Sequence, residues 1–137
     1  MSEILDIIKN DDSNQLQKII ENSDNLDKLY DIEKFDRYQK NSLKNLTIIH
    51  AAAYYNSLKC YTLLLKQEKF STRTLNPDSY YPFHYPCYRH SYDVFSYTLQ
   101  VDPLIIHSCP EGAKHQYLFL SAYGKDPRII EKLFEYK

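Results

Sequence analysis

Apolar residues recur at helical spacing in short clusters, each only a few turns long, along most of the chain. The clusters come in pairs, and a short polar or turn-forming stretch separates the two members of each pair. No stretch alternates apolar and polar residues as a half-buried strand would, so the pattern predicts an all-α fold. The paired clusters are Ile4–Ile8 with Leu16–Ile20, Ile48–Tyr55 with Leu58–Leu65, Phe83–Tyr88 with Val94–Leu99, and Tyr117–Tyr123 with Ile129–Phe134.

The last three pairs recur at a nearly constant spacing, whereas the first pair precedes the second by about 45 residues. When they are aligned, Thr47, Tyr81 and Gln116 fall at equivalent places, 34 and 35 residues apart. Helices this short are marginal in isolation and need neighbours against which to bury an apolar face. A period of about 33 residues, built from two short helices and a turn, is typical of stacked helical repeats.

The best-preserved unit begins at Thr47 with the sequence Thr-Ile-Ile-His-Ala-Ala-Ala, followed by Asn56 and the leucine-rich stretch Leu58–Leu65. It resembles an ankyrin repeat, with Ile48 in the place of the usual proline. Asn56 takes the place of the glycine that ends the first helix, and asparagine tolerates the left-handed conformation of such an end.

Two further units carry the resemblance more weakly. The unit that begins at Tyr81 keeps the proline and the histidine, as Pro82 and His84, but has Pro86 where the repeat has alanine. A proline inside that short helix is expected to remove one of its hydrogen bonds. The C-terminal unit keeps the small residues of the repeat, at positions 121–122, and the apolar rhythm of its second helix, for which Pro127 suits the first turn.

The resemblance implies a single ankyrin repeat domain over residues 1–137, folded as an ankyrin-like solenoid of about four repeats. The implied repeats cover residues 2–22, 45–69, 79–102 and 114–137, with an insertion over residues 23–44 after the first repeat. The apolar residues of this insertion lie at three- and four-residue spacings, which leaves two alternatives, an extra helix or a packed excursion.

The resemblance also assigns structural roles to the repeat motif. Ala52 and Ala53 are small and allow the first helix to approach its neighbours closely. The hydroxyl of Thr47 and the ring of His50 are expected to form hydrogen bonds to the backbone and so to tie the turn to the helix, and His84 is expected to do the same in the next repeat.

Composition limits the classes of partner. The 137 residues carry 17 Lys and Arg against 18 Asp and Glu, a net charge of −1 without the basic excess of a nucleic-acid-binding domain. No apolar run is long enough to span a membrane, and the first residues lack the pattern of a signal peptide. Three cysteines, Cys60, Cys87 and Cys109, are too few and too far apart for a disulfide framework. We therefore expect an intracellular, cytoplasmic protein that binds no nucleic acid and inserts into no membrane.

Candidate chemistry is sparse. His84, Cys87 and His90 lie at three-residue intervals, and His107, Cys109 and His115 cluster later in the chain, as partial zinc sites would. The repeat register accounts for the first group as a turn histidine, a packing residue and a turn residue, so we expect no metal site and no cofactor. No nucleophile motif is present, and the acidic pair at residues 11–12 falls in a turn. The sequence therefore predicts a protein that is not an enzyme.

Tyrosine is unusually abundant, with 14 residues. In proteins with ankyrin repeats, partners bind to the turn tips and to residues late in each first helix, which together line a concave groove. Carried over to this chain, the resemblance predicts binding by late-helix residues and, from the turn tips, by Tyr80 and His115. The late-helix residues are Tyr54, Tyr55, Tyr88, Arg89 and Tyr123.

Tyrosine and arginine dominate the binding energy of many interfaces, which favours this prediction. Other tyrosines lie outside the groove set, so the alternative is that some of the predicted rings pack against neighbouring helices.

Two functions follow from this interpretation. The first is a non-enzymatic module that binds another protein through the concave groove and the turn tips. The alternative is a structural module that associates with itself through uncapped terminal repeats, because the apolar cluster Ile129–Phe134 lacks an evident polar cap. The chain is accordingly expected to be a monomer or a weak homo-oligomer.

Overall fold

Seven α-helices and one 3₁₀ helix make up the regular structure in a computed structural model that describes residues 3–22, 26–32, 44–89, 91–108, 117 and 126–135. These residues include no strand, and their one β-bridge joins Tyr30 to Leu46. The predicted all-α class is confirmed for this part of the chain. The helices are α1 (Glu3–Lys9), α2 (Ser13–Asn22), α3 (Ile48–Tyr54), α4 (Leu58–Leu65), α5 (His84–Arg89), α6 (Tyr92–Val101), η2 (Pro103–His107) and α8 (Pro127–Glu135).

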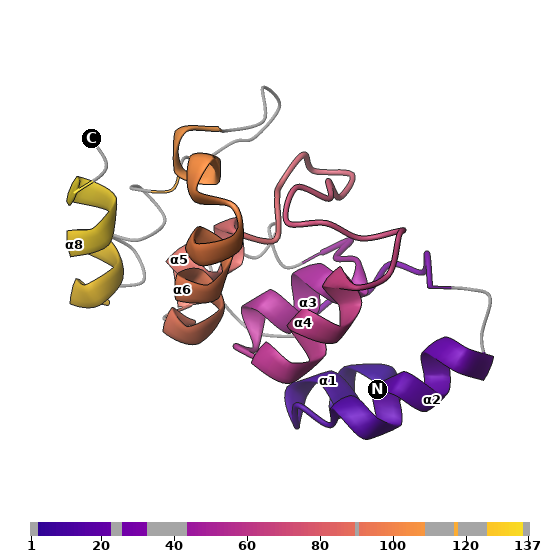
Figure 1. Ribbon diagram of the computed structural model, residues 1–137. Coiled ribbons are helices and arrows are strands. Elements are labelled where there is room, and N and C mark those ends of the chain that lie inside the picture. The colour runs from indigo at the N-terminus through magenta and orange to yellow at the C-terminus, as the bar shows by residue number, and fades with distance from the viewer. Residues whose placement is uncertain are drawn as a thin grey trace.

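The helices form two rows that stack in chain order (Figure 1). In the first row, α1 packs against α3 and α3 packs against α5. In the second row, α2 packs against α4, α4 against α6, and α6 against α8. Each of α1, α3 and α5 also packs against the helix that follows it. The pair α1–α2 therefore lies at one end of the stack and α8 at the other.

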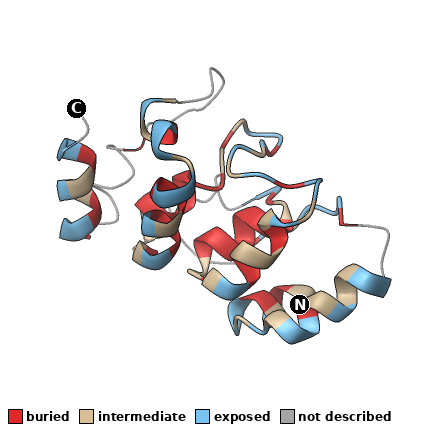
Figure 2. Cartoon of the chain, viewed as in Figure 1, coloured by how far each residue is buried: buried red, intermediate tan, exposed pale blue. Residues whose placement is uncertain are grey.

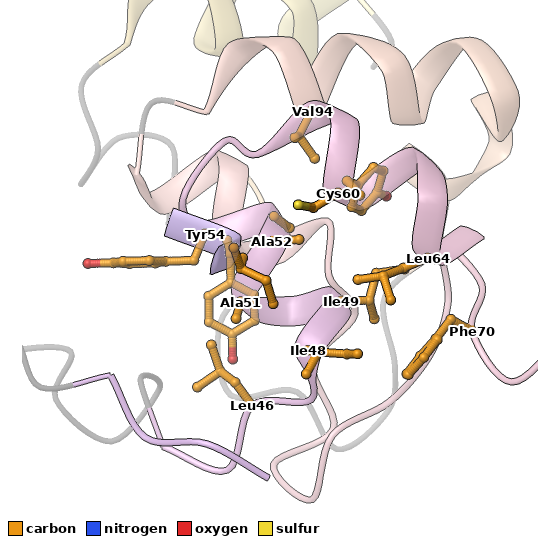
Figure 3. Close-up of a cluster of buried hydrophobic side chains, with 14 of the residues drawn as sticks. Leu46, Ile48, Ile49, Ala51, Ala52, Tyr54, Cys60, Leu64, Phe70 and Val94 are labelled. Carbon is orange, nitrogen blue, oxygen red and sulfur yellow. The ribbon is translucent and has the colours of Figure 1, made fainter. Parts of the chain in front are cut away.

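Helix α3 is buried along its whole length, as the red ribbon of Figure 2 shows. The three successive alanines at residues 51–53 have no exposed surface, and their small size lets α1, α4 and α5 approach α3 closely. Figure 3 shows two of them, Ala51 and Ala52, in one cluster with Cys60 and Leu64 of α4 and Val94 of α6. By contrast, α2 and α8 bury one face and expose the other (Figure 2).

The pair α5–α6 contributes to two apolar clusters, one toward each neighbouring part of the stack. Tyr85 and Val94 belong to the cluster that includes α1–α4. Cys87 and Phe95 belong to a second cluster, which reaches Ile129 of α8. The core therefore extends along the stack.

Two prolines fit the helices in which they lie. Pro86 is the third residue of α5, within the first turn, where a backbone N–H has no intrahelical acceptor. The expectation that Pro86 would remove a hydrogen bond from this helix is therefore wrong. Pro127 is the first residue of α8, as predicted.

The described residues of the predicted insertion, 26–32 and 44, form no helix. Leu26 and Ile32 are buried in the same cluster as α3, and Tyr30 exchanges two backbone hydrogen bonds of 2.8 Å with Leu46. This stretch is thus a packed excursion, the second of the two alternatives. Residues 33–43 lie outside the described part of the chain.

Candidate functional site

The turns between paired helices link each helical pair, here called a unit, to the next pair. Asp11 and Asn56 both follow a first-row helix and both adopt positive φ, at 53° and 57°. The Asp11 carboxylate accepts the backbone N–H of Cys60, at 2.9 Å, near the start of α4. The Asn56 side-chain oxygen accepts the N–H of Val94, at 3.1 Å, near the start of α6. The same bond therefore recurs at two successive junctions, and it satisfies helix N-terminal donors that lack partners within their own helix.

A second bond recurs at the same junctions. The buried hydroxyl of Ser57 donates to the backbone oxygen of Ile8 in α1. The buried hydroxyl of Ser91 donates to the backbone oxygen of Tyr54 in α3, at 3.0 Å. Each serine directly precedes a second-row helix, so its bond joins that helix to the previous unit's first-row helix.

The fully buried ring of His50 connects α3 to the loop before α5. Its Nε2 lies 2.7 Å from the backbone oxygen of Tyr80, and its Nδ1 lies 2.7 Å from the Thr47 hydroxyl. Because a carbonyl only accepts, Nε2 carries the proton, and Nδ1 of the neutral ring accepts the hydroxyl proton. Thr47 thus bonds to the ring of His50, where a bond to the backbone was expected. Burial lowers the pKa of His50 from 6.5 to about 4 despite the bond to the Tyr80 oxygen, which raises it.

His84 is also buried and holds the turn before α5. Its Nδ1 accepts the backbone N–H of Tyr81, at 3.0 Å. The ring centroid of His84 lies 4.8 Å from that of Tyr80 and 4.7 Å from that of Tyr117. The ring is therefore packed among aromatic side chains.

The structure corrects part of the predicted binding set. Tyr54 is 1% exposed and Tyr80 is 4% exposed, so neither ring is an accessible groove residue. Both rings instead fit the alternative interpretation, in which some of the predicted tyrosines pack against neighbouring elements. Tyr54 is buried because α3 packs against α1, α4 and α5. Tyr80 is buried because its ring packs against those of His84 and Tyr85.

Two members of the predicted set, Tyr55 and Arg89, are partly exposed and lie close together. The Arg89 guanidinium lies over the ring of Tyr54, 4.6 Å from its centroid, and the Tyr55 ring meets Tyr54 edge-on at 5.1 Å. Burial raises the pKa of Tyr55, an effect that the charge of Arg89 opposes, so the hydroxyl is protonated at neutral pH. We call Tyr55 and Arg89, with the Tyr54 ring beneath them, the Tyr55–Arg89 patch.

The remaining predicted binding residues cannot be placed in this patch. The backbone of Tyr88 lies in α5, but its side chain lies outside the described structure, as do the residues His115 and Tyr123.

The described residues hold no group of three or more His, Cys, Asp or Glu side chains that could bind a metal ion. His90, Cys109 and His115 lie outside this part of the chain. Cys60 and Cys87 are buried free thiols. Burial and the nearby Asp11 raise the pKa of Cys60 to about 12, and burial also raises the pKa of Cys87, so neither is a thiolate at neutral pH.

No helix within the described ranges has the length and apolar character needed to cross a bilayer. Comparison with known proteins adds no assignment, because the chain matches no protein-family model and no curated protein.

Sequence reasoning missed several polar residues that join distant segments. Asp11 was assigned only to a turn, although it occupies the same place in its unit as Asn56, and that equivalence was the available signal. The loop after α4 is held to the end of α6 by Thr72 and Arg73, which both donate to the Asp102 carboxylate. The Arg73 guanidinium holds the pKa of Asp102 below its usual value. No local pattern marks this contact, since it joins residues about 30 positions apart.

Proposed function

We propose that the chain is an ankyrin-like array of helical repeats that binds another protein, without catalysis, through the Tyr55–Arg89 patch. The recurrence of local geometry supports the repeat interpretation. Asn45 and Ser79, 34 residues apart, both adopt positive φ, and Ser57 and Ser91, also 34 apart, form equivalent bonds to the preceding unit.

The observation that carries the binding proposal is the position of accessible side chains in successive units. Asn10, Tyr55 and Arg89 each fall at the end of a first-row helix, and none of them is buried. Since α1, α3 and α5 pack side by side, these three ends form one edge of the stack. A partner that lies along this edge would contact three units at once.

The patch suits a binding role energetically. Arg89 and Tyr55 both rest on the buried ring of Tyr54, so their side chains are partly ordered before a partner arrives. Preordered side chains lose less conformational entropy on association. Tyrosine and arginine are also the residue types that contribute most often to binding hot spots.

Affinity capture from cell extract tests this proposal with a double variant, Tyr55→Ala with Arg89→Ala. Both side chains are partly exposed, so helical content by circular dichroism should be retained. We expect the captured amount of a specific partner to fall at least about tenfold, which corresponds to about 1.4 kcal/mol of binding free energy.

The matched control is Lys59→Ala with Ser96→Ala, which removes two exposed side chains from the second row, on α4 and α6. Capture by this control should equal that of the wild type. Equal capture by both double variants would show that the patch does not bind the partner.

One observation favours the alternative function, self-association through a terminal unit. Phe134 on α8, the last described helix, is 52% exposed, so this helix presents a large aromatic side chain to solvent. Under this alternative, sedimentation velocity should show concentration-dependent dimers that Phe134→Lys abolishes. A wild-type chain that stays monomeric at high micromolar concentration would contradict it.

We also infer that the protein works in a reducing, intracellular compartment and that its partner is a protein and not a nucleic acid. The buried free thiols of Cys60 and Cys87 support the first inference. The net charge of −1 supports the second.

A further inference from the structure

The described arginines differ in how their charge is balanced. Arg73 forms two hydrogen bonds to Asp102, at 2.9 and 3.0 Å, and Arg128 donates to both carboxylate oxygens of Asp126. Arg89 forms no ion pair with a carboxylate of the described residues. Among the described residues, it is therefore the one arginine that forms no charge-assisted hydrogen bond to a carboxylate.

The position of Arg89 restrains its side chain while leaving its hydrogen-bond donors available. The central carbon of the guanidinium lies over the Tyr54 ring, 4.6 Å from the ring centroid, and this cation–π contact restrains the side chain. This contact does not occupy the N–H donors with a carboxylate, so the guanidinium keeps the planar fork of donors that matches one. Tyr55, on the same ring, adds a hydroxyl that is protonated at neutral pH.

From this geometry we propose that the partner of the Tyr55–Arg89 patch is an acidic peptide segment, whose Asp or Glu carboxylate binds the guanidinium edge of Arg89. Charge complementarity selects this occupant, because Arg89 is a partly buried cation that no described carboxylate neutralises. The proposal rests on the proposed function and specifies the chemistry of its partner.

A neighbouring charge limits how acidic the segment can be. Asp6 of α1 lies close enough to Tyr55 to raise its pKa, so a negative charge already lies on that side of the patch. A second carboxylate directed toward α1 would be repelled. We therefore expect a segment with one acidic residue at Arg89 and neutral or basic residues toward α1, and weaker binding by polyacidic peptides.

Paired arrays of short synthetic peptides test the proposal. Each peptide with a central Asp or Glu has a partner in which Asn or Gln replaces that residue. For wild-type peptide binders we expect the acid-to-amide change to weaken binding about tenfold, with a preference that declines as salt is raised. Arg89→Gln should abolish the acid preference, Arg89→Lys should retain part of it, and the control Lys59→Gln, on exposed α4 surface, should keep it in full.

The outcomes separate the two proposals. Peptides that bind wild type without an acid preference, or with a preference that survives Arg89→Gln, overturn the acidic-partner inference and leave the binding function standing. If the wild-type chain binds no peptide on either array and captures no partner that depends on the patch, both the binding function and this inference are wrong. If Arg89→Gln loses helical content, the Arg89→Lys variant takes its place in the test. An acid preference of Arg89→Lys equal to that of the wild type at every salt concentration would then overturn the acidic-partner inference.

Discussion

Four described turns pass through residues with positive φ, and none of these residues is glycine. They are Asp11, Asn45, Asn56 and Ser79. Asparagine and aspartate accept the left-handed conformation better than other side chains because their short polar groups bond locally. In this chain the same groups also reach the next unit, as Asp11 does at Cys60 and Asn56 does at Val94. A glycine would make the turn but could not form the link.

Also at the residue scale, the neutral buried ring of His50 predicts a specific loss of stability in acid. Its pKa is about 4 in the folded chain against an ordinary 6.5, so between these values the unfolded chain binds a proton that the folded chain does not. The free energy of unfolding should therefore be unaffected well above pH 6.5 and should fall as the pH drops, by about 3 kcal/mol at about pH 4.

Chemical denaturation across this pH range measures the effect, with His50→Gln as the comparison. The variant should be less stable at neutral pH. It should lose less stability on acidification, because it lacks the titration of His50, but it should still lose some, because other titrating groups remain in both proteins. NMR titration of the imidazole signals gives the pKa of His50 directly. A His50 that titrates near its ordinary value, or equal acid slopes in the two proteins, would contradict the prediction.

At the scale of elements, the pairs α1–α2, α3–α4 and α5–α6 are joined, each to the next, by apolar contact and by a small number of polar bonds in recurring positions. The serine hydroxyls of Ser57 and Ser91 are the clearest of these, since both are 1% exposed and both bond to a backbone oxygen of the preceding unit. A buried carbonyl that loses its donor at a packed interface is costly, because water does not replace the bond.

We accordingly predict that Ser57→Ala and Ser91→Ala each lower the free energy of unfolding by about 1 to 2 kcal/mol. Ser96→Ala provides the matched control, because Ser96 is an exposed serine on α6 and its loss should change stability by less than about 0.5 kcal/mol. Urea denaturation of the three variants measures the difference. Equal stability of all three would mean that these hydroxyl bonds do not hold the units together.

The elements themselves could be predicted from the sequence to a large extent. The apolar clusters Ile48–Tyr55 and Leu58–Leu65 coincide with α3 and α4, because a helix that packs against neighbours must repeat its apolar residues with helical period. The 3₁₀ helix η2 and the Arg73–Asp102 contact had no such local signal. Both depend on how the chain returns after a helix, which local periodicity does not encode.

At the scale of the whole molecule, the candidate site was predicted less well than the helices. Tyr54 and Tyr55 are adjacent and identical in type, yet one is buried and the other partly exposed. The difference arises because α3 is enclosed by α1, α4 and α5, so only the residue that follows its last turn reaches solvent. Burial of this kind depends on contacts between units and cannot be read from one unit alone. Arg89 was identified by its register, but its contact with Tyr54 was not.

Stacking in chain order also has a consequence for how disturbances spread. If each pair of helices contacts only its neighbours, a cavity in an end unit should loosen that unit first, whereas a cavity in an inner unit should loosen both sides of the stack. Ile8 of α1 and Leu64 of α4 allow a matched comparison, because both are fully buried aliphatic side chains. Truncation to alanine should cost about 2 to 5 kcal/mol at either site.

Hydrogen exchange read by mass spectrometry distinguishes the two cases. Ile8→Ala should speed exchange in α1 and α2 and leave α5 and α6 near wild-type rates, whereas Leu64→Ala should speed exchange from α1 through α6. The expectation follows from the contacts, since α1 packs on α2 and α3 but α4 packs on α2, α3 and α6. A uniform increase of the exchange rate in every helix of Ile8→Ala would contradict this expectation. It would mean that the two rows open as one cooperative unit, because the substitution would then affect helices that α1 does not contact.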